Sequence, residues 1–252
     1  MNEKEISIKS TDEIVLNALI SKVSDNKKIV ILCHGITANK EECGMFTKLT
    51  SELRNHKINS LRFDFRGHGK STGNDYEMTP TKEAEDVKSV MKYVTELGYN
   101  EIVILGASFG ASAISLVDYS QYKEVKAIID WYGAIDYLKS TVPYWDEENR
   151  KIANEKGYVE LKGKSFRLGK ACFDEIYSLK PYENLAKVNL PILFLHGTKD
   201  EKVPHQISLD ASKKCKNARI ELIENAGHVF LDSKEIMEQA IKITVDFIKE
   251  QL

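Results

Sequence analysis

The sequence predicts an α/β fold in which α-helices wrap a mostly parallel β-sheet. Two patterns support this prediction. Continuously apolar runs such as residues 28–33 are typical of parallel strands that are buried on both faces, and they alternate with longer segments whose apolar residues recur at helical spacing. The 252 residues, 42% of them hydrophobic, can fill one such core. We therefore expect residues 1–252 to form a single α/β domain.

The first half of the chain supplies these elements in a regular order. Residues 6–8 and 14–20 predict two antiparallel strands joined by the polar turn Ser10-Thr11-Asp12. The alternation of strands and helices then begins, and Gly98 marks the end of one helix. We expect strands at 28–33, 58–63, 102–105 and 125–131, and helices at 42–56, 81–97 and 109 to about 120.

An interruption follows in the second half. From Ala134 to about Lys180 the alternation stops, and the segment is rich in charged and aromatic residues. It is too long for a simple connection, so it is either a lid or a disordered insertion. Its aromatic content favours an ordered lid over residues 134–180. The alternation then resumes, with expected strands at 191–195 and 219–223 and helices at 206–214 and 233–249.

Composition and charge exclude several classes of partner. The 36 basic and 38 acidic residues give a net charge of -2 and are well mixed, so we expect no nucleic-acid partner. Residues Met1–Ser10 lack the apolar core of a signal peptide, and no apolar run approaches the roughly 20 residues that span a membrane. The four cysteines are scattered, with Cys33 in an apolar strand, which is typical of a reducing compartment. We expect a soluble, cytoplasmic protein that does not associate with membranes.

One glycine-rich stretch, Gly67-His68-Gly69-Lys70-Ser71, resembles the end of a phosphate-binding loop. That loop needs a glycine five residues before Gly69, and the residue there is Asp64. The phosphate-loop interpretation therefore fails. The sequence also has no HExxH, paired CxxC or calcium-loop spacing, so we expect no protein-bound metal.

The pentapeptide Gly106-Ala107-Ser108-Phe109-Gly110 carries the clearest chemical signal. It directly follows the apolar run 101–105 and opens a segment of small residues that suits a closely packed helix. A strand that ends in Gly-x-Ser-x-Gly and turns into a helix displays its serine at the apex of a tight bend. The sequence therefore predicts that Ser108 is an exposed nucleophile at the carboxyl end of a sheet.

Ser108 needs a base and an orienting acid, and later loops supply both. His196-Gly197-Thr198-Lys199-Asp200 and Asn225-Ala226-Gly227-His228 each follow an expected strand. Because the carboxyl ends of parallel strands share one edge of the sheet, Ser108, Asp200 and His228 can converge. His228 can accept the serine proton, and Asp200 can fix the histidine tautomer. Asp232 is an alternative orienting acid.

A tetrahedral intermediate also needs donors for its oxyanion. The backbone N–H of Phe109, directly after the serine, is one candidate. The other is the N–H of Ile36, in the loop after the strand 28–33. The stretch His34-Gly35-Ile36 has one glycine, unlike the glycine-rich form of many lipases and esterases.

Taken together, these motifs resemble the α/β-hydrolase superfamily over almost the whole chain. The segments that carry the resemblance are His34-Gly35, residues 63–71, Gly106–Gly110, His196–Asp200 with Val203-Pro204, and Ala226–His228. Within the superfamily the chain is similar to bacterial feruloyl/cinnamoyl esterases and related small serine carboxylesterases, and residues 180–184 (Lys-Pro-Tyr-Glu-Asn) add to this similarity. The resemblance implies an α/β-hydrolase fold with an eight-stranded sheet and helices on both faces. It also implies an acyl-enzyme mechanism without metal or organic cofactor.

The expected function is hydrolysis of carboxylic esters with hydroxycinnamoyl or short-to-medium acyl groups, and the expected partner is a small-molecule ester. A monoacylglycerol lipase, an exopeptidase and a non-catalytic ligand-binding protein remain alternatives, and a homodimer stays open. The residues expected to contact substrate are His34, Tyr144, Trp145 and Phe166. His34, like His196, lies before a glycine at a strand end and could instead hydrogen-bond the loop backbone.

Overall fold

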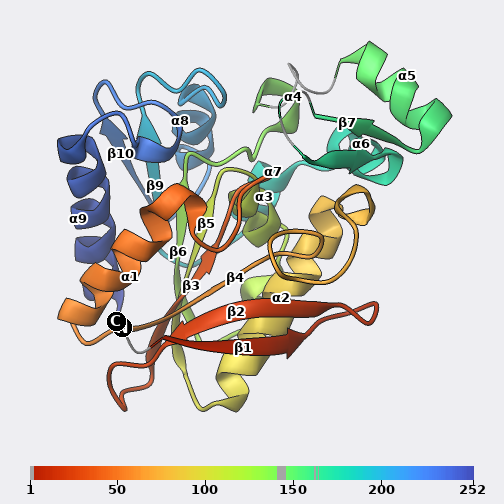
Figure 1. Ribbon diagram of the computed structural model, residues 1–252. Coiled ribbons are helices and arrows are strands. Elements are labelled where there is room, and N and C mark those ends of the chain that lie inside the picture. Colours follow the sequence, from red (N-terminus) through yellow and green to blue (C-terminus); the bar gives the residue numbers. More distant parts are fainter. Residues whose placement is uncertain (1–2, 141–145, 162, 164) are drawn as a thin grey trace.

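A computed structural model describes residues 3–140, 146–161, 163 and 165–252. In these residues the main sheet has eight strands in the order β1-β2-β4-β3-β5-β6-β9-β10 (Figure 1). β2 pairs antiparallel with β1 and β4, and the other pairs are parallel, which confirms the predicted mostly parallel sheet. The strands are β1 (Glu3–Lys9), β2 (Val15–Ser21), β3 (Lys28–Cys33), β4 (Asn59–Phe63), β5 (Glu101–Ala107), β6 (Val125–Trp131), β9 (Ile192–Gly197) and β10 (Ala218–Ile223).

Helices cover both faces of this sheet, as Figure 1 shows. Alternate residues of β3 explain why both faces are apolar: Ile29 and Ile31 join one buried cluster, and Val30 and Leu32 join the other. The first cluster includes side chains of α2, α3 and α8, and the second includes side chains of α1 and α9. The helices of these layers are α1 (Met45–Asn55), α2 (Pro80–Glu96), α3 (Phe109–Ser115), α7 (Pro181–Leu185), α8 (Gln206–Ser212) and α9 (Lys234–Gln251).

Two helices differ from their predicted bounds by more than two residues. The helix expected at 42–56 is α1, which begins at Met45 after the single turn η1 (Glu42–Gly44). Glu42, Cys43 and Gly44 all have positive φ, so this turn cannot continue into the helix. The helix after Ser108 ends at Ser115 rather than near 120, because a separate turn follows in which the Asp118 side chain accepts the Ser120 N–H.

The described residues of the insertion 134–180 lie over the carboxyl edge of the sheet (Figure 1). Its short strands β7 and β8 pair antiparallel, and its apolar residues form a third buried cluster that includes Phe109, the neighbour of Ser108. The described part of this insertion therefore packs against the turn that carries Ser108. That the insertion acts as a lid stays a prediction. Its elements are α4 (Tyr137–Ser140), α5 (Glu147–Lys156), β7 (Tyr158–Glu160), β8 (Arg167–Gly169) and α6 (Lys170–Ser178).

A polar contact attaches the insertion to the turn η2 (Asp75–Glu77). The Arg167 guanidinium donates to both oxygens of the Asp75 carboxylate and lies over the rings of Tyr76 and Tyr158. A Cβ on Gly169 would lie 1.8 Å from the Tyr76 carbonyl oxygen, so the two segments approach as closely as backbones can. The insertion is thus tied to a loop of the main domain.

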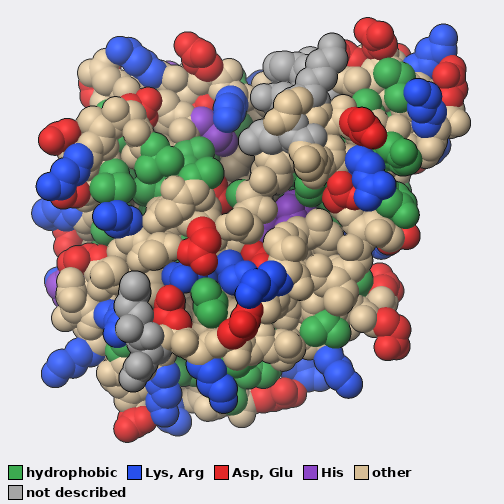
Figure 2. All heavy atoms as spheres, in the orientation of Figure 1, with side chains coloured by type: hydrophobic (Ala, Val, Ile, Leu, Met, Phe, Trp, Pro, Cys, Tyr) green, Lys and Arg blue, Asp and Glu red, His purple; other side chains and the backbone are tan. Residues whose placement is uncertain are grey.

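The surface carries charges of both signs. On the face in Figure 2, Lys and Arg side chains are interspersed with Asp and Glu rather than gathered by sign. No helix within the described ranges combines the length and the apolar character required to cross a membrane.

Candidate active site

Ser108 lies at the turn between β5 and α3, with φ 52° and ψ -116°. This strained conformation is typical of a serine held at a strand-to-helix elbow. The flanking glycines are required sterically, since a Cβ on Gly106 would lie 2.6 Å from the Ala111 Cα and one on Gly110 would lie 2.4 Å from the His34 carbonyl oxygen. The Ser108 N–H donates to the Trp131 carbonyl at the end of β6, which fixes the turn to the sheet.

His228 lies in the turn η4 (His228–Phe230), which follows β10. Its Nε2 is 3.1 Å from the Ser108 Oγ, and its Nδ1 is 2.6 Å from the Asp200 Oδ2. An ionised carboxylate can only accept, so Nδ1 carries the proton and Nε2 is free to accept from the serine hydroxyl. The structure therefore brings Ser108, His228 and Asp200 into one hydrogen-bonded chain across three loops.

Asp200 is held in its charged form. Burial opposes ionisation, but His196, His228 and the Val203 N–H donate to the carboxylate and keep its pKa well below the ordinary value. The alternative acid, Asp232, accepts the Gly227 N–H at 2.8 Å. Asp232 thus shapes the loop before His228, while Asp200 is the acid that contacts the imidazole.

The loop after β3 lies beside the serine. A Cβ on Gly35 would be 3.0 Å from the Ser108 Cβ, so this loop packs directly against the elbow. Both predicted oxyanion donors, Ile36 and Phe109, line the cavity in front of Ser108. Among the described residues, neither backbone N–H has a hydrogen-bond acceptor. Both are therefore available to an oxygen bound in the cavity.

This cavity has a volume of about 220 Å³ and a mostly apolar lining. Residues near Ser108 and His228 line it together with side chains of the insertion. The lining residues are Gly35, Ile36, Thr37, Ala38, Glu42, Cys43, Ser108, Phe109, Ala134, Ser140, Leu161, Leu168, Lys202, Val203, His228 and Val229. The arrangement suits a carbonyl group at Ser108 with an apolar group under the insertion.

The other predicted substrate contacts lie elsewhere. His34 is buried behind the loop, where its Nδ1 donates to the Gly35 carbonyl and its Nε2 accepts the Phe65 N–H, so it shapes the backbone instead of lining the cavity. Burial and the nearby His68 lower the pKa of His34 to about 3, so the ring is neutral. Phe166 stacks on His68 and is likewise outside the lining. Tyr144 and Trp145 lie outside the described residues.

Sequence reasoning missed several residues of the site. Leu161 and Leu168 belong to a segment whose apolar residues follow neither helical nor strand spacing, and only its aromatic residues indicated substrate contact. Glu42 was expected to be the first residue of a helix, where an acidic residue is ordinary. Within the described ranges, no group of three or more His, Cys, Asp or Glu side chains could hold a metal ion.

Comparison with known proteins places the chain in a family. The pattern of the alpha/beta hydrolase family matches residues 30–239. The human mitochondrial palmitoyl-protein thioesterase ABHD10 is 26% identical over 201 residues, which are 76% of this chain and 63% of that protein. The chain thus spans less than two thirds of this relative's length.

Solved structures show the same fold. Est1E from Butyrivibrio proteoclasticus, solved with ferulic acid bound, superposes with a TM-score of 0.84 at 24% identity over 98% of both chains. Mouse alpha/beta hydrolase domain-containing protein 10 gives a TM-score of 0.79 at 22% identity, covering 98% of this chain and 99% of that one. With most of its length matched by the family pattern, the chain belongs to the alpha/beta hydrolase family.

Proposed function

We propose that this protein is a serine carboxylesterase whose nucleophile, base and orienting acid are Ser108, His228 and Asp200. The observation that carries the proposal is the hydrogen-bonded chain itself: Nε2 lies 3.1 Å from the serine oxygen, and the carboxylate lies 2.6 Å from Nδ1. These separations already fall within the range that proton transfer from serine requires.

The reaction follows from this geometry. Ser108 Oγ attacks the ester carbonyl as its proton moves to His228 Nε2, and the charge that develops on imidazole is stabilised by Asp200. The carbonyl oxygen becomes an oxyanion that the N–H groups of Ile36 and Phe109 can bind. His228 then protonates the departing alcohol and leaves an acyl group on Ser108. Water, deprotonated by His228, releases the acid and restores the serine.

The cavity supports an acyl group of short to medium length. Sites that enclose a drug-sized ligand typically measure about 300–1,000 Å³, and the cavity here measures about 220 Å³. Its apolar lining, including Leu161 and Leu168, favours an uncharged acyl group. The human relative is a palmitoyl-protein thioesterase, so a thioester belongs among the substrates to be tested.

The deciding experiment compares wild type with Ser108→Ala on aryl esters of increasing acyl length, a hydroxycinnamoyl ester and a thioester. We expect turnover by the wild type to be greatest for short and medium acyl groups, and the variant to lose at least about 10³-fold in kcat. A fluorophosphonate should label wild type at Ser108 and leave the variant unlabelled. Full turnover by Ser108→Ala would overturn the proposal.

We also propose a cytoplasmic location. Cys33, Cys172 and Cys215 are buried and form no disulfide. Buried, scattered thiols suit a reducing compartment. Cell fractionation should recover the protein with cytosolic markers, and recovery from an oxidising compartment would contradict this placement.

A further inference from the structure

Glu42 is a buried carboxyl group next to the triad, and the mechanism above does not use it. It is 3% exposed and lies in the left-handed turn η1, directly before α1. Its Oε2 accepts the Gly35 N–H at 2.7 Å, and its Oε1 accepts the Tyr132 hydroxyl at 3.2 Å. The side chain thus joins the loop that carries Ile36 to the segment that follows β6.

Tyr132 extends this connection to His228. Its backbone has φ 41° and its N–H donates to the Leu195 carbonyl, so the residue is fixed at the end of the sheet. Its ring lies 4.7 Å from the His228 ring, centroid to centroid, and 4.9 Å from that of Phe230. The ring therefore packs against the imidazole.

We propose that Glu42 is a positioning residue that holds the Ile36 loop in register with His228, through Gly35 on one side and Tyr132 on the other. The inference rests on the proposed function, since it concerns the relative placement of an oxyanion donor and the base. Both must meet the same carbonyl group, and a misplacement of 1 Å can cost about 10²-fold in rate. Glu42 spans the two parts directly.

The charge state of Glu42 adds a second consequence. Burial raises its pKa to about 7, although Gly35 and Tyr132 both donate to it. The titratable group that faces Glu42 directly is the Tyr132 hydroxyl, and burial raises the pKa of this hydroxyl and keeps it protonated. His228 and the ionised Asp200 lie beyond the Tyr132 ring, and the Cys43 thiol is next to Glu42 in the sequence. Among the described residues, the groups that lower the pKa of Glu42 are the Gly35 N–H and the Tyr132 hydroxyl, and no lysine or arginine adds to them.

Ionisation of Glu42 places a negative charge beside the site where the oxyanion forms. A Cβ on Gly35 would lie 3.5 Å from the Glu42 Oε1 and 3.0 Å from the Ser108 Cβ, so one small residue separates the carboxyl group from the elbow. The protonated carboxyl keeps its contacts without that charge. We therefore expect Glu42 to support turnover best when protonated and to reduce it as the pH rises through about 7.

Glu42→Ala and Glu42→Gln separate position from charge. Alanine removes both contacts, and we expect kcat to fall about 10- to 100-fold with little change in KM. Glutamine can accept from Gly35 and donate to Tyr132 but does not ionise. We expect Glu42→Gln to keep most of the wild-type kcat, and its kcat relative to wild type to increase as the pH rises from 5.5 to 8.5. Tyr132→Phe, which keeps the ring against His228, should show an intermediate loss.

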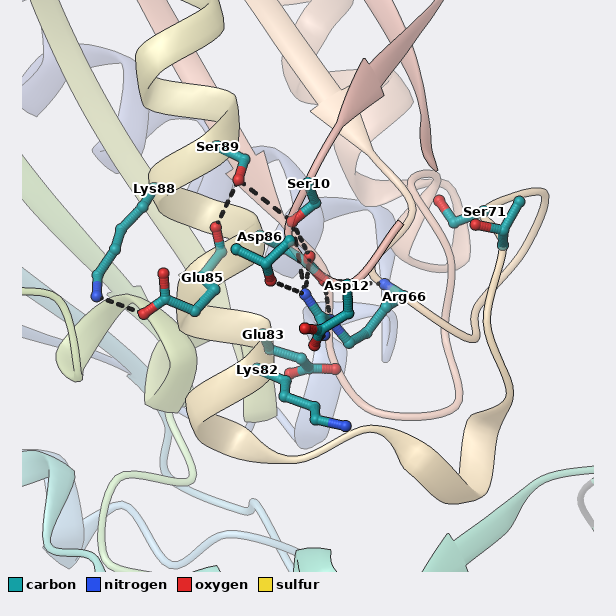
Figure 3. Close-up of polar contacts among 12 residues, drawn as sticks. Ser10, Asp12, Arg66, Ser71, Lys82, Glu83, Glu85, Asp86, Lys88 and Ser89 are labelled. Atoms are coloured by element: carbon teal, nitrogen blue, oxygen red, sulfur yellow. Dashed lines mark hydrogen bonds and ion pairs between the residues drawn. The ribbon is translucent and has the colours of Figure 1, made fainter. Parts of the chain in front are cut away.

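Glu83→Gln is the matched control. Glu83 is also a buried glutamate whose pKa burial raises well above the ordinary value. It lies on α2 beside Asp86 and Arg66 (Figure 3) and does not line the cavity. We expect kcat and its pH profile to be unchanged in this variant. If kcat relative to wild type rose with pH equally in Glu83→Gln and Glu42→Gln, the effect would be a general one of altering buried carboxyl groups, and the inference would be overturned.

The outcomes distinguish this inference from the proposed function. If Ser108→Ala keeps its turnover, the esterase assignment fails, and the inference fails with it. If Ser108→Ala is inactive while a folded Glu42→Ala has the wild-type kcat, only the positioning role is wrong. If Glu42→Ala does not fold, Tyr132→Phe and Glu42→Gln decide. The inference is overturned if Tyr132→Phe has the wild-type kcat and the kcat of Glu42→Gln relative to wild type does not change with pH. It is supported if Tyr132→Phe loses kcat and the relative kcat of Glu42→Gln rises with pH.

Discussion

Two groups of buried charges in this molecule are compensated in different ways. In the Arg66 cluster (Ser10, Asp12, Arg66 and Asp86; Figure 3), the guanidinium donates to both oxygens of Asp86 at 2.8 and 3.0 Å and also reaches Asp12. At the triad edge (Ser108, His228, Asp200 and the neighbouring Glu42), no guanidinium or ammonium group of the described residues binds the carboxylates in this way. Asp200 accepts from histidines and backbone N–H groups, and Glu42 accepts one N–H and one hydroxyl.

This difference explains what each region can do. Charge-assisted hydrogen bonds to both oxygens of Asp86 hold the Arg66 guanidinium in one geometry, so we expect the Arg66 cluster to act on the stability of the fold. At the triad edge the two carboxyl groups are kept apart in pKa, with Asp200 well below its ordinary value and Glu42 near 7. Separation of this kind within one site is typical of groups with distinct roles in catalysis.

The largest expected effect is a loss of kcat on substitution of Asp200. Asp200→Asn keeps the size of the side chain but allows the wrong tautomer of His228, and we expect kcat to fall by about 10⁴-fold. Steady-state kinetics on an aryl ester measure the change. Asp232→Asn is the control, because Asp232 contacts the Gly227 N–H rather than the ring. Comparable losses in the two variants would refute the assignment of Asp200.

The Arg66 cluster should respond in stability instead of rate. Asp86→Ala leaves the buried Arg66 with Asp12 as its remaining carboxylate, and Asp12 is largely exposed. Removal of one partner from a buried ion pair typically costs about 3–5 kcal/mol. We expect urea unfolding to show a loss near the lower end of that range, while kcat per folded molecule stays unchanged. A large fall in kcat with normal stability would break the distinction between the two regions.

The sequence predicted the triad better than it predicted the buried carboxyl group beside it. Ser108, Asp200 and His228 were identifiable because each follows an expected strand, and the ends of parallel strands share an edge. Glu42 was not, because its burial depends on a left-handed turn at 42–44 inside a segment with helical periodicity. Its partner Tyr132 also gave no signal, since a tyrosine after a buried strand is ordinary core composition.

The acyl side of the cavity could not be predicted for a different reason. Aromatic content suggested Phe166 as a substrate contact, but the ring packs against His68 within the domain. From the insertion, the lining includes the aliphatic side chains of Leu161 and Leu168, which carry no chemical signature. Only the path of the insertion across the sheet edge determines which of its residues face Ser108.

A pH titration of stability sharpens the comparison further. Glu83 has a raised folded-state pKa, so its favourable contribution is complete below the ordinary glutamate pKa and is lost as the pH rises through the folded value. Glu83→Gln lacks this loss. Its Tm relative to wild type should therefore increase with pH between 4.5 and 8.5, with a slope of at most about 1.4 kcal/mol per pH unit in unfolding free energy. A constant difference in Tm would show that Glu83 does not titrate in this range.

The smallest expected effect concerns the fit of the acyl group. Leu168 is fully buried on β8 and lines the cavity, so Leu168→Ala should enlarge the space in front of Ser108. Because one methylene in an apolar pocket is worth about 1–3 kcal/mol in discrimination, kcat/KM should shift toward longer acyl chains by roughly tenfold for each added carbon that the space admits. Leu138→Ala, at an exposed position of the same insertion, is the control. An unchanged acyl profile in Leu168→Ala would mean that the acyl group leaves the triad in another direction, and the insertion would then have no part in selecting the substrate.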